Sequence, residues 1–462
     1  MGGMASEETR TQDHPGMGTA TTDGHRSATE GSPMRTWSDA SGASDASSTA
    51  AGTSPARAWA VRLVVVGIVL SALNLRPAIT SLGALLEEVR DGLGMSGSVA
   101  GLLTSVPPLC FAVFGVMAPR LARRFGLGAV VCAGMAAIAA GLLIRPYAGG
   151  TAGFLAASAL ALMGIAVSNV LMPVIVKRWF PDRVGSMTGL YSMALALGTS
   201  LAAAVTVPMT AAMGGGWQTG LAVWAALAAV AVVPWIPFVR DRDGIRTGQS
   251  GSAPRLPHPR AEAGQAPAPR ITRSRTAWAL AVFFGLQATA AYITMGWMAQ
   301  IFRDAGVDAG TAGLLLAVTM VMGVPLAFVI PRLATRLPQQ GPIALALGVC
   351  GLAGYAGLYL APAQGAWAWA LLLGVSNCAF PLALTMVGMR ARTGAGVAQL
   401  SAFAQSTGYL ISIPGPLLVG VLYQHSGGWG LPLALMAALM VPQMAVGVLA
   451  GRNRTVEDEA AG

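Results

Sequence analysis

The amino-acid sequence predicts an all-α integral membrane protein with twelve transmembrane helices arranged in two six-helix bundles. Three observations lead to this prediction: a charge-poor composition, twelve apolar segments of membrane-spanning length, and a repeat that relates the two halves of the chain. Of the 462 residues, 54% are hydrophobic and 10% are charged, and the mean hydropathy is +0.61. Soluble domains carry about 25% charged residues, so the composition indicates a chain that lies in a lipid bilayer.

The first part of the chain is polar. Residues 1–56 are rich in Ser, Thr, Gly, Ala and Asp and show no apolar period, which is typical of a disordered segment. They lack the order of basic, apolar and small residues that marks a signal peptide. We therefore expect a disordered cytoplasmic tail, within which Met4, Met17 and Met34 offer alternative translation starts.

Twelve apolar segments follow, each long enough to cross a hydrocarbon core of about 30 Å. They lie at 59–84, 98–119, 127–146, 151–176, 185–211, 217–239, 277–302, 309–331, 341–361, 366–389, 394–424 and 429–451. A polar, arginine-rich linker at 240–276 separates the two sets of six, and a short tail follows at 452–462. The N-terminal bundle is thus predicted over 57–239 and the C-terminal bundle over 277–451.

The second half of the chain repeats the first at an offset of about 210 residues. Gly101 and Pro119 of the second segment recur as Gly313 and Pro331 of the eighth, with the same spacing of 18. Further matched pairs are Ser168 with Ser376, Asn169 with Asn377, Pro173 with Pro381, Ala194 with Ala404, and Gly198 with Gly408. Six helices duplicated in one orientation place two bundles around an axis along the membrane normal, with a site between them.

Positive charges gather in alternate loops. Every loop after an even-numbered segment carries Lys or Arg, as at Lys177 and Arg332, whereas the other loops hold only Arg90, Arg145 and Arg303. Cation-rich loops stay in the cytoplasm. We therefore predict that both termini and the linker are cytoplasmic and that the protein is a multi-pass component of a bacterial-type inner membrane.

The main functional clue is Arg76, which lies well inside the first apolar segment. An arginine at that depth costs roughly 2.5 kcal/mol or more, so it usually faces a cavity or a partner. Pro77 follows it, removes a backbone donor and frees the carbonyl of Leu73. Helix breaks at membrane depth typically line a protein-enclosed site. We predict that Arg76 binds substrate in a central cavity and that Pro77 acts as a hinge; the alternative is that Arg76 braces a neighbouring helix.

Two polar neighbours of Arg76 are further substrate-binding candidates. Thr80 shares the helix face of Arg76. Asn74 points about 160° away from Arg76 on an ideal helix, so both reach one cavity only if Pro77 distorts the helix.

The loop after the second segment resembles the signature motif of the major facilitator superfamily. The matching stretch reads Gly115-Val-Met-Ala-Pro119-Arg120-Leu-Ala122-Arg123-Arg124. It departs from the motif by Pro119 in place of the usual Asp and by Ala122 in place of the second Gly. The resemblance implies the major facilitator fold and a gating role for Arg120, Arg123 and Arg124.

More narrowly, the chain from about 59 to 451 resembles the cyanate permease and 2-nitroimidazole exporter family. The matching residues are Asn74-Leu75-Arg76-Pro77-Ala78, then Gln287, Tyr292 and Trp297, then Phe380-Pro381-Leu382-Ala383-Leu384, and finally Ala404-Gln405-Ser406 with Gly408-Tyr409; Gln300 replaces an expected proline. The resemblance implies transport of a small solute and adds Gln287, Tyr292 and Trp297 to the substrate-binding candidates. Gln287 and Tyr292 point about 140° apart, so one of them faces away from a shared cavity.

The eleventh segment carries a polar stripe. Ser401, Gln405 and Tyr409 recur at every fourth residue, on one helix face. We predict that the stripe binds substrate; the alternative is that its side chains join helices by hydrogen bonds. Asn169 and Asn377 each stand four residues before a proline and are predicted to mark hinges.

Several functional classes are disfavoured by what the sequence lacks. The cysteines have no CxxC spacing and the histidines are scattered, so neither a metal site, a cofactor nor catalytic residues are expected. Basic residues sit at segment ends without interleaved aromatics, which argues against nucleic acid as a partner. No GxxxxGK[ST] loop occurs, so ATP is not the driver. Carboxylates that can carry protons, such as Glu87 and Glu88, lie at segment ends.

We therefore predict a secondary active transporter, not an enzyme, that acts as a monomer in the lipid bilayer by alternating access. Its predicted cargo is a small anion or small polar solute, cyanate-like or organic, held by Arg76, with protons as a candidate coupling ion. One alternative is an exporter of small neutral heteroaromatics such as nitroimidazoles, which would bind Tyr292, Trp297 and Tyr409. A different class is a membrane sensor that binds cargo without moving it.

The charge bias makes the topology testable. Single cysteines placed in the 240–276 linker should react with an impermeant thiol reagent only in inside-out vesicles, because the linker is predicted to be cytoplasmic. The native cysteines all lie within apolar segments and provide a low background. Labelling of the linker in intact cells would overturn the orientation.

Overall fold

The computed structural model describes residues 55–239 and 271–461. The predicted N-terminal tail, up to residue 54, and most of the predicted linker, residues 240–270, lie outside the described residues. All regular elements within the described ranges are helices, and twelve segments are long and apolar enough to cross a membrane, which confirms the predicted fold class.

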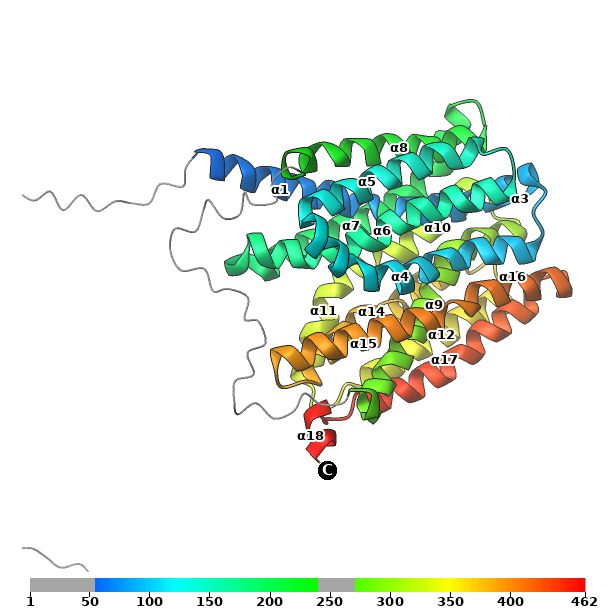
Figure 1. Ribbon diagram of the computed structural model, residues 1–462. Helices are drawn as coiled ribbons and strands as arrows, with labels where there is room; N and C mark the ends of the chain where they lie inside the picture. Colours follow the sequence, from blue (N-terminus) through cyan, green and yellow to red (C-terminus); the bar gives the residue numbers. More distant parts are fainter. Residues whose placement is uncertain (1–54, 240–270, 462) are drawn as a thin grey trace, which may run out of the picture. The chain divides into compact units, whose positions relative to one another are not determined.

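The N-terminal bundle contains the first six spans. Its elements are α1 (Pro55–Asn74) and α2 (Pro77–Ala84) in the first span, the short α3 (Leu86–Leu93), α4 (Gly97–Phe125), α5 (Leu127–Ile144) with η1 (Arg145–Tyr147), α6 (Thr151–Trp179), η2 (Pro181–Arg183), α7 (Val184–Ala212), and α8 (Trp217–Val232) with η3 (Val233–Phe238). Figure 1 shows these helices side by side, from blue to green.

The C-terminal bundle contains the other six spans. Its elements are η4 (Ile271–Arg273), α9 (Arg275–Asp304), α10 (Ala309–Val321) with α11 (Gly323–Arg336), α12 (Gly341–Leu360), α13 (Ala366–Ser376) with α14 (Ala379–Met389), α15 (Gly394–Ser412) with α16 (Pro414–Ser426), α17 (Gly430–Ala450) and the short α18 (Val456–Ala461). We call the end of the bundles where α1 begins and α17 ends the linker end, and the opposite end, which carries α3, the far end (Figure 1).

Equivalent residues make the same close contacts in both bundles, as the internal repeat predicts. A Cβ atom on Gly134 of α5 would lie 2.5 Å from the Ser168 hydroxyl of α6, and one on Gly351 of α12 would lie 2.6 Å from the Ser376 hydroxyl of α13. Small residues allow transmembrane helices to approach closely where no hydrophobic effect drives them together. Each bundle therefore packs its third and fourth spans through the same glycine–serine crossing.

The two bundles pack tightly against each other at the far end. A Cβ atom on Gly101 of α4 would lie 2.9 Å from the Leu417 carbonyl oxygen of α16, and one on Gly313 of α10 would lie 2.6 Å from the Ala203 carbonyl oxygen of α7. Gly101 and Gly313 are equivalent positions of the repeat. Backbone-to-backbone packing of this kind closes the far end.

The bundles separate toward the linker end. There α7 and the second half of the eighth span, α11, enclose a cavity of about 180 Å³. It is lined by Thr188, Gly189, Ser192, Met193, Gly323, Val324, Ala327 and Phe328. The same span that presses on α7 at the far end thus leaves space beside it at the linker end.

Breaks interrupt the spans in both bundles. The first span is broken at Leu75 and Arg76, between α1 and α2, where its proline predicts a break. The tenth span is broken at Asn377 and Cys378, whereas the equivalent Asn169 lies within the continuous helix α6. Asn377 therefore occupies a helix break, and Asn169 does not.

The last residues form a docked helix rather than a free tail. The Glu457 carboxylate accepts a hydrogen bond of 3.0 Å from the backbone N–H of Arg392, just before α15. The Glu459 carboxylate accepts hydrogen bonds from the hydroxyls of Ser274 (2.6 Å) and Thr276 (2.7 Å) at the start of α9. We call residues 456–461 the C-terminal clamp because they hold the linker ends of α9 and α15 together.

The clamp is expected to respond to acid. Burial raises the pKa of Glu459, but hydrogen bonds from Ser274 and Thr276 outweigh it and lower that pKa below its ordinary value of 4.5. A lowered pKa in the docked state means that the stabilisation is present above 4.5 and is lost as the pH falls through the docked value. The melting temperature of Glu459→Gln should therefore lie below that of the wild type at pH 7, and the difference should shrink toward pH 4. Asp182→Asn, at an exposed carboxylate of the same end, is the control; a pH-independent difference would contradict this role of Glu459.

Candidate substrate site

Arg76 lies at the break in the first span, with half-buried side chain, directly before α2. Its carbonyl accepts hydrogen bonds from the backbone N–H of Ile79 (2.9 Å) and of Thr80 (3.1 Å) and from the Thr80 hydroxyl (3.1 Å). Thr80 therefore helps to satisfy the backbone at the break, as membrane depth requires. Because Arg76 lies in the break, its side chain is not part of the regular side-chain rows of α1 or α2.

Three tyrosines lie within electrostatic range of the guanidinium. Arg76 lies close enough to the hydroxyls of Tyr191, Tyr292 and Tyr409 to interact electrostatically with each. They come from α7, α9 and α15, so both bundles contribute. All three are buried, with 8%, 3% and 8% of their surface exposed. Within the described chain Arg76 forms no ion pair with a carboxylate, so its nearby polar partners are neutral.

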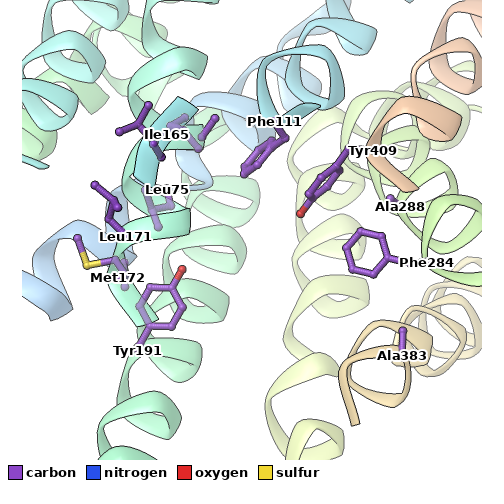
Figure 2. Close-up of a cluster of buried hydrophobic side chains, with 14 of the residues drawn as sticks. Leu75, Phe111, Ile165, Leu171, Met172, Tyr191, Phe284, Ala288, Ala383 and Tyr409 are labelled. Atoms are coloured by element: carbon purple, nitrogen blue, oxygen red, sulfur yellow. The ribbon is translucent and has the colours of Figure 1, made fainter. Parts of the chain in front are cut away.

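The orientation of Tyr191 is fixed from the fourth span. Its hydroxyl donates a hydrogen bond of 2.7 Å to the Asn169 side-chain oxygen on α6. Figure 2 shows the hydroxyl groups of Tyr191 and Tyr409 pointing from opposite sides into the space between the two bundles. Asn169 thus acts as a positioning residue in this conformation.

Aromatic rings join the two bundles beside this site. Phe111 of α4 stacks on Tyr409, with ring centres 5.0 Å apart, and lies 6.4 Å from the ring of Tyr292. Phe284 of α9 meets Tyr409 edge-on at 5.2 Å. Such pairs contribute about 0.5–1.5 kcal/mol each beyond their buried area. These ring contacts therefore pack α4 of the N-terminal bundle against α9 and α15 of the C-terminal bundle (Figure 2).

Three of the predicted substrate-binding side chains are used elsewhere. The Asn74 amide donates to the carbonyls of Leu70 (2.7 Å) and Leu227 (3.2 Å), the latter on α8. Asn74 thus faces away from Arg76, because the break does not rotate it toward the site.

Gln287 and Trp297 also form hydrogen bonds with other helices. Gln287 donates to the Asn377 carbonyl (3.0 Å) and accepts from Gln443 (3.1 Å), so it ties α9 to the broken tenth span and to α17. The Trp297 ring N–H donates to the Thr104 hydroxyl (3.2 Å) at the bundle interface. In this conformation Asn74, Gln287 and Trp297 bind neighbouring helices, and their role in substrate binding stays a prediction.

The polar stripe of the eleventh span remains beside the site. The Gln405 amide donates to the Ser401 hydroxyl at 2.8 Å, and both residues are half-buried. Tyr409 is the end of the stripe that meets the Arg76 cluster. The sequence reasoning missed Tyr191, although Tyr191 occupies the repeat position of Ser401, and this equivalence was the signal that could have found it. Phe111 carries no such signal.

Charged residues connect the bundles at the far end. Arg303 of α9 pairs with Glu87 (2.9 Å) and Glu88 (3.0 Å) of α3. Gln300 donates to Glu87 (3.3 Å) and to Asp304 (2.6 Å). We call Glu87, Glu88, Gln300 and Arg303 the far-end latch, since it joins the N-terminal to the C-terminal bundle. The Arg303 side chain is only 16% exposed, so these pairs are less screened than ordinary surface pairs.

The basic cluster at the linker end forms no comparable latch. Arg120 donates only a long hydrogen bond of 3.5 Å to the Val116 carbonyl of its own helix, and Arg124 lies 5.2 Å from the ring centre of Phe125. Arg120, Arg123 and Arg124 take part in no ion pair among the residues described. Their gating role stays a prediction.

Twelve spanning helices in two repeated bundles, with an arginine at a helix break between them, define a membrane transporter of small solutes. The chain belongs to the Major Facilitator Superfamily, whose sequence profile matches residues 64–398. This confirms the superfamily to which the loop motif and the repeat point.

Curated relatives narrow the family. The chain is 35% identical over 398 residues to the uncharacterized transporter YycB of Bacillus subtilis (strain 168), covering 85% of this chain and 94% of that protein. It is 32% identical over 401 residues to a 2-nitroimidazole transporter of Escherichia coli (strain K12), covering 85% and 96%. It is 30% identical over 380 residues to the cyanate transport protein CynX of the same strain, covering 82% and 94%.

A solved structure agrees with the fold. The xylose transporter XylE from E. coli, in an inward-open conformation, matches with a TM-score of 0.67 at 11% identity, covering 87% of this chain and 99% of that chain. This likeness shows the architecture of two six-helix bundles.

Proposed function

We propose that this transporter moves a small anion, cyanate-like or organic, across the cytoplasmic membrane, with Arg76 as its binding cation. The observation that carries the proposal is the Arg76 guanidinium, held at a helix break between the bundles among three tyrosine hydroxyls. A guanidinium presents a planar fork of donors that suits carboxylate or cyanate-like acceptors. The relative named for cyanate supports this cargo class.

Neutral heteroaromatic cargo is the second candidate. The stacked Phe111 and Tyr409 rings, with Tyr292 beside them, provide faces on which a flat ring can pack. The relative named for 2-nitroimidazole supports this reading. Because a nitro group also accepts hydrogen bonds from a guanidinium, both cargo classes use the same residues.

The contacts between the two bundles support transport by alternating access. The far end is closed by the Gly101 and Gly313 contacts and by the far-end latch, and the linker end holds the cavity between α7 and α11. With the linker end cytoplasmic, as the cation bias indicates, this conformation faces inward. Rocking of the bundles about the Arg76 site then opens the far end. The site lies within one chain, so a monomer suffices.

Arg76 can be tested by substitution. Arg76→Met should weaken cargo binding about 10- to 100-fold, because hydrogen bonds to a charged group contribute about 1.5–3 kcal/mol. Arg76→Lys should retain part of the binding, since it keeps the charge but loses the planar fork. The measurement is flux and binding in proteoliposomes with cyanate, small carboxylates and 2-nitroimidazole.

The matched control is Arg62→Met, which removes an exposed arginine of α1, in the same span as Arg76. Melting temperature and membrane level should stay close to wild type in both Met variants. If Arg76 is a brace instead, Arg76→Met loses stability in step with activity. Unchanged cargo binding by a well-folded Arg76→Met protein excludes the anion site.

Proton coupling can be separated from latching at the far end. We expect Glu87→Gln with Glu88→Gln to reduce the response of flux to a proton gradient, because these carboxylates lie at the bundle interface. Arg303→Gln breaks the same ion pairs and leaves both carboxylates in place. A change in gradient response confined to the double Gln variant indicates proton carriage, whereas an equal change in both variants indicates a latch alone. Full gradient-driven flux in the double variant excludes proton carriage by Glu87 and Glu88.

A further inference from the structure

A second arginine is buried in the N-terminal bundle. Arg145, which the charge pattern places in a loop, begins η1 at the far end of α5 and is only 2% exposed. Its guanidinium donates to the Ala78 carbonyl (2.9 Å) and lies 3.4 Å from the Ser81 hydroxyl, both on α2. It therefore contacts the same short helix that begins directly after Arg76.

No carboxylate balances this charge within the described part of the chain, where Arg145 takes part in no ion pair. The ring centre of Phe154 lies 6.0 Å from the guanidinium carbon. Burying an uncompensated charge costs several kcal/mol even after relaxation. Two hydrogen bonds to neutral oxygens satisfy donors but do not neutralise the cation.

Two buried polar groups without a hydrogen-bond partner in the described chain belong to residues that line one cavity beside Arg145. They are the Arg145 Nε–H and the hydroxyl of Ser158, a residue of α6 that is 1% exposed. Both residues line a cavity of about 20 Å³, together with Thr104, Tyr292 and apolar residues of α2 and α4. The cavity thus lies next to a buried positive charge and to two residues that each carry an unpartnered donor.

The size of the cavity and the donors of its lining residues indicate which particle it can bind. A space of roughly 10–15 Å³ by this measure holds one water-sized particle, and the cavity is only slightly larger. A water molecule would accept the hydrogen bonds but leave the charge of Arg145 uncompensated. A monatomic halide accepts both hydrogen bonds and balances the charge.

We propose that the cavity between Arg145 and Ser158 is a halide site, which chloride would fill, distinct from the substrate site at Arg76. The proposal does not depend on the identity of the cargo. Tyr292 and Gly296 of α9 also line the cavity, and Gly83 of α2 packs against the Met295 carbonyl beside them. The site is therefore complete only while α2 and α9 are packed together at the far end, so the bound halide stabilises the conformation that is closed there.

The test measures the melting temperature of the purified full-length protein at constant ionic strength while chloride or bromide replaces gluconate, which is too large for the cavity. We expect a saturable rise with either halide. Ser158→Ala should shift the halide midpoint about tenfold, because it removes one donor to a charged ligand. Arg145→Lys, which keeps the charge but lacks Nε, should weaken the response at least as much.

Two controls locate the ion. Ser168→Ala removes another buried hydroxyl without a partner in the described chain, one that does not line the cavity, and should keep the wild-type midpoint. Arg76→Met should also keep it, which separates this site from the substrate site. In crystals grown with bromide, anomalous scattering should place the ion between Arg145 Nε and Ser158 Oγ. A halide response that Ser158→Ala leaves intact, or water alone in the cavity, overturns the proposal.

Discussion

The centre of this protein depends on one constraint, a guanidinium at membrane depth that pairs with no carboxylate among the residues described. Arg76 needs polar partners there, and the lipid provides none. The chain meets this need by ending α1 at Asn74 and starting α2 at Pro77, so that the side chain reaches the bundle interface. Neutral tyrosine hydroxyls lie within electrostatic range of it there. Because they do not cancel its charge, the site remains attractive to an anion.

Helix α2 links this site to the far end. Arg76 precedes its first residue, and Arg145 donates to the carbonyl of Ala78 and reaches Ser81 in its middle. The opposite side of α2 packs against α9 through Gly83, where a larger residue would collide with the Met295 carbonyl. Movement of the bundles that separates α2 from α9 must therefore change the surroundings of both arginines. This helix is only eight residues long, so it can shift as one rigid unit.

The sequence predicted features that follow from hydropathy and repeated spacing. The twelve spans, the break at Pro77 and the recurrence of Gly101 as Gly313 were all visible, because they rest on long apolar segments, on proline chemistry and on an offset between halves. The hydrogen-bond and packing partners of individual side chains could not be predicted from the sequence. Gln287 satisfies the break at Asn377, and Arg145 at a segment end is indistinguishable in sequence from a loop cation. Such facts depend on which helix lies opposite, which one sequence leaves open.

The repeat gives the two bundles the same scaffold, whereas the site between them is asymmetric. Duplication provides two bundles with equal glycine crossings, at Gly134 and Gly351, so the scaffold needs the same small residues in both halves. The site, in contrast, has different residues in the two halves. Tyr191 in the fifth span occupies the position that Ser401 holds in the eleventh, and the cation Arg76 stands in the first bundle opposite Tyr292 and Tyr409 of the second. Under the proposed function, a cargo between this cation and these hydroxyl-bearing rings would contact both bundles. Binding of such a cargo therefore depends on the distance between the bundles, which is the quantity that alternating access changes.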